Sequence, residues 1–173
     1  MNNEFIESHI HDIPDFPKEG IIFKDISPLL ASAKARSIST ELLVRDFRGQ
    51  TIDVVVGIES RGFLFGMLLA DALNAKFVML RKPGKLPGAI ISQEYELEYG
   101  TDTLELQENA ISPGDCVLIH DDVLATGGTA MAAAQIIQKA GGKVEGFNFV
   151  IELDFINGRE KIKDYKIASV LHY

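Results

Sequence analysis

The sequence VLIHDDVLATGGTA, residues 117–130, decides the fold of this chain. It begins with an apolar run of strand type, Val117–Ile119, and continues into two adjacent carboxylates, Asp121 and Asp122. A turn of small residues follows, and an alanine-rich stretch then predicts a helix over residues 131–140. A strand, a short turn and a helix in this order are the building unit of a parallel sheet that is covered by helices.

The turn between this strand and this helix has the chemistry of a phosphate-binding loop. Its residues are Ala125, Thr126, Gly127, Gly128 and Thr129. Glycines let backbone N–H groups approach an anion, threonine hydroxyls add donors, and the helix N-terminus adds positive electrostatic potential. The preceding carboxylates would repel a phosphate, so they are explained if they face hydroxyls or a metal ion, as on a sugar phosphate. The alternative is a solvated acidic turn in which a threonine only caps the helix, and the acid pair alone does not decide between the two.

The rest of the chain alternates between strand and helix patterns. The β-branched run Ile52–Ile58 is typical of a strand that is buried on both faces. The other predicted elements are a polar N-terminal arm (1–20), helices at 35–47, 62–73 and 154–163, and strands at 76–80, 143–151 and 167–170. Residues 90–98 and 103–107 alternate apolar and polar side chains around a turn, which predicts a projecting antiparallel hairpin. Together these patterns predict one parallel sheet with helices on both faces and a ligand site beyond the carboxyl ends of its strands.

Length and composition indicate a single folded domain over residues 1–173. The apolar runs are too short to span a bilayer, and the net charge of −8 argues against binding to nucleic acid, so we expect neither a membrane nor a nucleic-acid partner. No secretory pattern is visible at the N-terminus and Cys116 is the single cysteine, so we expect a cytoplasmic location. His9 and His11 lack the neighbouring cysteine or histidine that would complete a metal site.

Two further segments place charge near the same edge of the predicted sheet. Glu59-Ser60-Arg61 follows the Ile52–Ile58 strand, and an arginine at that point can hold a second anion through a charge-assisted fork. A salt bridge at the start of a helix is the more common role for such a segment. The loop that contains Arg81, Lys82 and Lys85 is basic in an acidic chain, and it is compatible with a solvated loop as well as with a polyanion-binding loop.

Residues 117–130 resemble the phosphoribosyl-pyrophosphate (PRPP) binding motif of the type I phosphoribosyltransferases, with His120 at a position that is usually apolar there. Phe23-Lys24-Asp25-Ile26, Glu59-Ser60-Arg61-Gly62-Phe63 and Leu97-Glu98-Tyr99-Gly100 are more specific, and they resemble the adenine phosphoribosyltransferases. This resemblance extends over nearly the whole chain. It implies an α/β fold with an open parallel sheet and helices on both faces, a small base-binding hood at residues 1–30 and a mobile hairpin lid at residues 90–107.

The resemblance implies purine salvage, by a magnesium-dependent transfer of the phosphoribosyl group of PRPP to adenine that gives AMP and pyrophosphate. The implied contacts of the 5′-phosphate are Ala125, Thr126, Gly127, Gly128 and Thr129, and those of the ribose are Asp121 and Asp122, directly or through magnesium. Pyrophosphate would contact Glu59, Ser60, Arg61, Lys82 and Lys85, and adenine would contact Ile22, Phe23 and Lys24. The implied catalytic residues are Glu98, Tyr99 and Arg61, and Glu98 is the one that would handle the proton on adenine. The family also implies a cis peptide bond, most simply between Glu59 and Ser60, and a homodimer.

Two alternative functions stay open at this point. A phosphoribosyltransferase for hypoxanthine, guanine or orotate would use the same phosphate loop, although Phe23 and the Leu97–Gly100 segment argue against it. A non-catalytic PRPP-binding regulator usually carries a DNA-binding segment, and none is visible here. From the residues alone, Phe23 is better interpreted as a core residue, and Glu98 is one of several hairpin carboxylates. His120 is either a partly buried imidazole that is bonded to backbone or a group that perturbs the acid pair.

Overall fold

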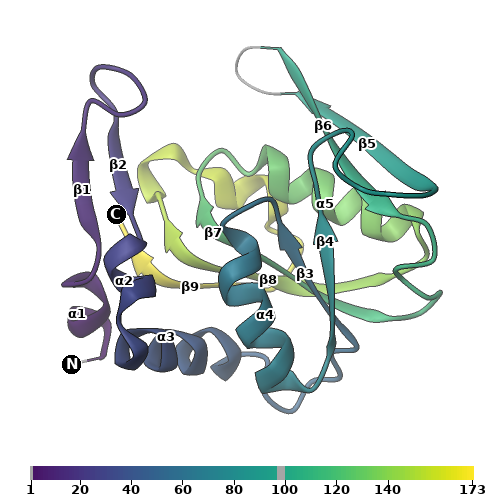
Figure 1. Ribbon diagram of the computed structural model, residues 1–173, viewed down its shortest axis with the longest axis horizontal. Coiled ribbons are helices and arrows are strands. Elements are labelled where there is room, and N and C mark those ends of the chain that lie inside the picture. The colour runs from purple at the N-terminus through teal and green to yellow at the C-terminus, as the bar shows by residue number, and fades with distance from the viewer. Residues whose placement is uncertain (1, 97–99) are drawn as a thin grey trace.

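The computed structural model describes residues 2–96 and 100–173, and its centre is a sheet of five strands (Figure 1). The strand order is β4-β3-β7-β8-β9, and every neighbouring pair is parallel. The strands are β3 (Val54–Ile58), β4 (Lys76–Leu80), β7 (Cys116–Leu124), β8 (Lys143–Glu152) and β9 (Ile167–His172). The predicted α/β fold with an open parallel sheet is confirmed.

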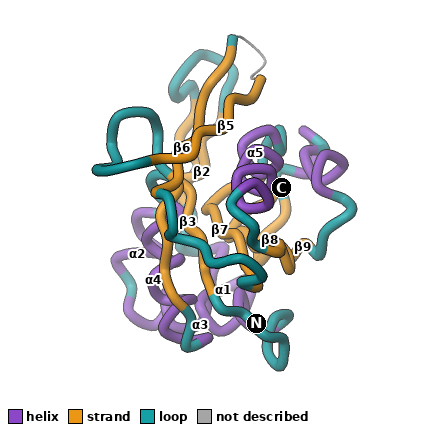
Figure 2. The backbone as a smooth tube through the Cα atoms, turned by 90° about the vertical axis from the view of Figure 1, so that its right-hand side faces the viewer, coloured by secondary structure: helices purple, strands orange, loops and turns teal. Residues whose placement is uncertain are grey.

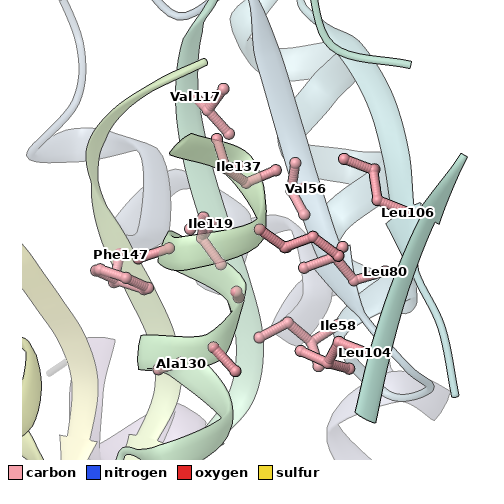
Figure 3. Packing of buried hydrophobic residues seen from close by; sticks show 14 of the residues in the cluster. Val56, Ile58, Leu80, Leu104, Leu106, Val117, Ile119, Ala130, Ile137 and Phe147 are labelled. Carbon is pink, nitrogen blue, oxygen red and sulfur yellow. The ribbon is translucent and has the colours of Figure 1, made fainter. Parts of the chain in front are cut away.

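Helices cover both faces of this sheet, because successive strand residues point to opposite faces. On one face, α5 (Gly128–Lys139) packs over Ile119 and Phe147 (Figure 3). On the other face, α3 (Ala33–Arg45) and α4 (Gly62–Leu73) pack over Leu118 and its neighbours. Figure 2 shows α5 on the opposite side of the strands from α3 and α4. All five residues of β3 are buried, as its β-branched run predicts.

The central strand β7 is longer than its apolar run. Pairing with β8 continues from Asp121, opposite Phe149, to Leu124, opposite Glu152. The acid pair therefore lies inside the strand rather than in a turn after it. Because neighbouring strand residues point to opposite faces, the two carboxylates leave the sheet on different sides.

At the N-terminus, residues 2–31 form a small unit of helices and strands, which we call the hood. It contains α1 (Asn2–Glu7), an antiparallel pair of β1 (His11–Pro14) with β2 (Ile22–Asp25), and α2 (Ser27–Ala31). Ile6 of α1 is fully buried in the core, which ties the hood to the main domain. The hood and a hairpin of two strands, β5 (Ile90–Glu96) and β6 (Thr101–Gln107), rise at opposite ends of the sheet, on the same side (Figure 1).

The hairpin is formed by β5 (Ile90–Glu96) and β6 (Thr101–Gln107), which pair antiparallel from Ile90 opposite Gln107 to Glu96 opposite Thr101. Leu104 and Leu106 are fully buried near Leu80 and α5 (Figure 3). The base of the hairpin is thus part of the core, whereas its far end projects from it.

One helix prediction is confirmed and one needs correction. The predicted helix at 35–47 is observed as α3; Leu43 and the following Phe47 are buried, and Ile38 and Leu42 pack half-buried against the same core cluster. The predicted helix at 154–163 is two short 3₁₀ segments, η1 (Asp154–Ile156) and η2 (Gly158–Ile162). Asn157 separates them with a left-handed backbone (φ 59°), which an α-helix cannot contain.

The lengths and composition of the helices bear on whether the described part of the chain could cross a membrane. Within residues 2–96 and 100–173, none of them combines the length and the apolar character that crossing a bilayer requires.

Candidate active site

The phosphate loop joins the carboxyl end of β7 to the start of α5. Gly127 has a left-handed backbone (φ 75°) and directly precedes the first helical residue, Gly128. Asp121, Thr126, Gly127 and Thr129 are among the residues that line a small cavity of about 80 Å³ at this point. The first N–H groups of a helix have no intrahelical partner, so the start of α5 presents free donors to this cavity.

A larger cavity of about 350 Å³ lies beside the phosphate loop. Its lining is Glu59, Ser60, Arg61, Asp121 and Asp122. Asp121 lines both cavities, so the two are neighbours. The peptide bond between Glu59 and Ser60 is cis, as the resemblance implies. The two segments meet because β3 and β7 are adjacent parallel strands, with Gly57 opposite His120.

The two carboxylates of the acid pair have different surroundings. Asp122 is almost fully buried, and its Oδ2 lies 2.6 Å from Nε of Arg61. Asp121 Oδ1 accepts a hydrogen bond from the backbone N–H of Asp122 at 2.9 Å. Burial and the nearby charge of Asp122 raise the pKa of Asp121 well above its ordinary value. This carboxyl group therefore gains most from a ligand that brings positive charge or hydroxyl donors.

Glu59 contacts the basic loop, residues 81–85, at three points. Its buried carboxylate pairs with Lys85 and with Arg81 Nε at 3.3 Å, and it accepts from the backbone N–H of Lys82 at 2.7 Å. Burial opposes ionisation of Glu59, but these hydrogen bonds outweigh it and lower its pKa to about 2. Lys82 Nζ in turn pairs with Asp102 and donates to the hydroxyl of Tyr95 at 2.8 Å. The basic loop is therefore held in place by ion pairs with two carboxylates from other segments, Glu59 and Asp102.

The hood contributes an aromatic platform. The ring of Phe23 on β2 contacts Phe16 edge-on, with 5.2 Å between ring centroids. The guanidinium of Arg61 lies 4.8 Å from the Phe23 ring centroid, within the range of a cation–π contact. Arg61 thus bridges the platform and the acid pair. Lys24 Nζ lies 2.7 Å from Asp12 and 3.7 Å above the ring of Tyr173, so its side chain points away from Phe23.

His120 is a fully buried core residue. Its Nδ1 lies 2.8 Å from Oδ1 and 3.1 Å from the backbone oxygen of Asn148, and the amide nitrogen of Asn148 donates to Leu43. Both partners of Nδ1 are oxygens, so Nδ1 carries the hydrogen. Burial lowers the pKa of His120 to about 4, although Asn148 and the charge of Asp122 work in the opposite direction. At neutral pH this imidazole is uncharged, and it fills the usually apolar position by packing against Phe65.

Comparisons with known proteins identify one family. Residues 29–169 match the phosphoribosyl transferase domain family. The adenine phosphoribosyltransferase of Flavobacterium johnsoniae is 58% identical over 168 residues, which are 97% of this chain and 99% of that protein. The chain belongs to the adenine phosphoribosyltransferase family.

Solved structures of this family superpose closely on the chain. The crystal structure from Rhodothermus marinus has a TM-score of 0.96 at 47% identity and covers 99% of this chain and 98% of that chain. The structure from Saccharomyces cerevisiae, complexed with an imino-altritol bisphosphate and adenine, has a TM-score of 0.92 at 40% identity and covers 98% of both chains. The predicted family and the type I phosphoribosyltransferase fold are confirmed.

Of the residues that the family resemblance assigns to catalysis, Arg61 lies in the site, whereas Glu98 and Tyr99 lie outside the described residues. Their roles stay predictions. A second group of residues behind the phosphate loop, Glu152, Gly158 and Arg159, has little signal in the sequence. These residues are more than 20 positions from the loop along the chain, and only the glycine in front of Arg159 gives a local hint of close backbone approach.

Proposed function

We propose that residues 125–129 bind the 5′-phosphate of PRPP in the reaction of this family. In that reaction the phosphoribosyl group of PRPP is transferred to adenine, and AMP and pyrophosphate are formed. The observation that carries the proposal is the pair of neighbouring cavities that share Asp121. One has the backbone and hydroxyl donors of an anion site, and the other has two carboxylates and an arginine beside it.

Asp121 and Asp122 are proposed to hold the ribose hydroxyls, with magnesium bound to PRPP nearby. Two adjacent carboxylates fit this ion, because magnesium prefers oxygen ligands. Burial and the charge of Asp122 raise the pKa of Asp121, and a bound cation would favour the ionised form of this carboxyl group. Bound magnesium would supply positive charge to the pyrophosphate as it leaves. Asp122 is already paired with Arg61, so the carboxylate of Asp121 is the one more available for hydrogen bonds to the ligand.

Pyrophosphate is proposed to bind at Glu59, Ser60 and Arg61, with Lys82 and Lys85 adding positive charge. In the described part of the chain both lysines are paired with carboxylates, Lys82 with Asp102 and Lys85 with Glu59. A polyanion would compete with these carboxylates for the same ammonium groups. The role of Glu59 is therefore to place the cations, because its own carboxylate would repel pyrophosphate.

Adenine is proposed to stack on Phe23, and the backbone of Ile22 and Lys24 is proposed to read its edge. β2 belongs to a two-stranded sheet with β1, which leaves the other edge of β2 without a strand partner in the described residues. Residues 22 and 24 point their backbone groups to the same edge, since strand residues two apart are equivalent. Arg61 lies over the Phe23 ring, so binding of the base requires it to move aside.

Catalysis is proposed to depend on Glu98, Tyr99 and Arg61. Glu98 would take or hold the proton on adenine while the new bond to the ribose forms. The hairpin lid would exclude water that otherwise hydrolyses PRPP. The described part of the hairpin reaches the site through Tyr95, whose hydroxyl accepts from Thr129 at 3.3 Å.

A cytoplasmic homodimer is proposed as the working form. Leu64 and Met67 on α4 and Met79 on β4 expose 46%, 49% and 40% of their surfaces, and α4 packs against β4. β4 is also an edge strand, which favours covering this face with a second copy. Light scattering should give twice the mass of the chain, and Met67→Glu should reduce it to the mass of one chain.

The activity is tested by incubating the protein with magnesium, PRPP and one base at a time and measuring pyrophosphate release. Release with adenine alone supports the proposal. Release with hypoxanthine, guanine or orotate instead would contradict the choice of base. Binding of PRPP without turnover of any base would favour a PRPP-binding regulator.

A further inference from the structure

The back of the phosphate loop is in direct backbone contact with the first residue of η2. A Cβ atom placed on Gly158 would lie 1.9 Å from the backbone oxygen of Ala125 and 2.8 Å from the backbone nitrogen of Gly127. A Cβ atom on Gly127 would lie 2.3 Å from the backbone oxygen of Gly158. Two glycines are thus needed for this approach, and the position of η2 sets the position of the loop.

An ion pair next to this contact holds η2 to the sheet. Arg159 donates from Nε to Oε1 of Glu152 at 2.7 Å and from Nη2 to Oε2 at 2.6 Å, which is a two-point fork. Ser169 on β9 donates to the same Oε2 at 2.6 Å. Glu152 is 3% exposed and lies opposite Leu124, the last residue of β7 before the phosphate loop. The fork therefore connects η2 to the strand end from which the loop leaves.

These residues also include a group that resembles a metal site. Glu152, Asp154 and His172 offer ligand atoms that lie within 4.8 Å of one another. However, both oxygens of Glu152 already accept hydrogen bonds from Arg159, and Nδ1 of His172 lies 3.0 Å from Asp154. Arg159 thus supplies the positive charge that a metal ion would otherwise bring, and the group serves as an ion pair between η2 and the end of β8.

We propose that Arg159 is a positioning residue for the 5′-phosphate: its fork to Glu152 holds Gly158 against the phosphate loop so that the loop donors converge on one anion. Arg159 acts through the loop and does not touch the substrate. The inference rests on the proposed assignment of residues 125–129 to the 5′-phosphate. Loss of the fork lets η2 move away from Gly127 and weakens the phosphate site, while the pyrophosphate site on β3 stays intact.

The test separates the two anion sites. Binding of ribose 5-phosphate and of magnesium pyrophosphate is measured by calorimetry for wild type, Arg159→Met, Arg159→Lys and Lys163→Met. Lys163 is the matched control, because it is an exposed cation four residues further on whose partner Glu160 is also exposed. In Arg159→Met the affinity for ribose 5-phosphate should fall about ten-fold, as expected when the displaced loop loses one hydrogen bond to the phosphate, with pyrophosphate affinity unchanged. Steady-state kinetics should show a similar rise in the KM for PRPP, with kcat and the KM for adenine within about two-fold of wild type.

Arg159→Lys keeps a charge beside Glu152, so it should fold and should recover part of the affinity for ribose 5-phosphate. Unchanged affinity in both Arg159 variants, or an equal loss for the two ligands, would overturn the inference. Thr126→Ala tests the underlying assignment separately. If Thr126→Ala leaves ribose 5-phosphate binding unchanged, the phosphate loop itself is wrongly assigned, whatever the Arg159 variants do.

Discussion

Substituting His120 by glutamine should remove a measurable part of the acid sensitivity of this fold. His120 is fully buried, its Nδ1 donates to Asn148, and burial lowers its pKa to about 4 from an ordinary 6.5. A glutamine amide can still donate to Asn148, but it cannot take up a proton. The comparison therefore isolates the protonation of one side chain.

Acid lowers the free energy of unfolding because the unfolded chain binds a proton on His120 more tightly than the folded chain does. The unfolded chain protonates this histidine below its ordinary pKa of 6.5, whereas the folded chain resists protonation until the pH approaches about 4. The stabilisation is therefore complete above 6.5 and is lost as the pH falls toward 4. With these two values, the linkage relation gives a loss of about 2 kcal/mol in the free energy of unfolding between about pH 7.5 and about pH 5.

Urea unfolding followed by circular dichroism at these two pH values measures the effect. The wild type should lose about 2 kcal/mol more than His120→Gln over this interval. His120→Val should lose as little free energy of unfolding between the two pH values as His120→Gln does. It should be less stable than the wild type at both pH values, because Asn148 loses a buried hydrogen-bond donor. An equal loss in the wild type and in both variants would refute the conclusion that His120 is buried in its neutral form.

Further substitutions test the site. Thr126→Ala should raise the KM for PRPP about ten-fold in steady-state assays, because one hydroxyl donor to the 5′-phosphate is lost; an unchanged KM would remove Thr126 from the site. Gly158→Ala should lower the melting temperature and raise the KM for PRPP, since its Cβ would lie 1.9 Å from the oxygen of Ala125; unchanged values of both would show that the backbone contact is dispensable. Glu59→Gln should cost at most about 3 kcal/mol in urea unfolding at neutral pH, because the folded pKa of Glu59 is about 2, and this stabilisation is lost only as the pH falls from 4.5 toward 2; equal acid sensitivity of the variant would contradict this. Glu98→Gln should lower kcat more than it changes the KM for either substrate, and the reverse pattern would assign Glu98 to binding.

Local sequence pattern predicts the elements whose ends are marked by a change in residue type. α4 and β4 have the bounds that their patterns predict, Gly62–Leu73 and Lys76–Leu80, because each is a largely apolar run that ends at polar residues, Asn74 after α4 and Arg81 after β4. The hairpin also follows from its alternation: Leu104 and Leu106, two residues apart, share one buried face of β6, and Glu105 between them is buried as a polar residue that accepts from the backbone N–H of Gly84. These patterns depend only on residues close in the chain, so they can be read without knowledge of the partner.

Pattern fails where a distant segment decides the local structure. β7 continues through the polar residues Asp121 and Asp122 because β8 supplies its hydrogen-bond partners. The predicted helix at 154–163 is interrupted because Glu152 holds Arg159 and the phosphate loop occupies the space beside Gly158. β8 and the phosphate loop both lie more than 20 residues along the chain from the segments that they shape, so a local pattern does not contain them.

The sequence by itself determined the family, the parallel α/β fold, the phosphate-loop motif and the acid pair of Val117–Ala130, because each of these depends on residue types at fixed spacing within continuous segments. The tertiary structure decided how that motif is used. It placed Arg61 between Phe23 and Asp122, buried His120 as a neutral imidazole, and clamped η2 behind the loop. Contacts of this kind join segments that are tens of residues apart, so only close packing and the balance between burial and ion pairing decide them.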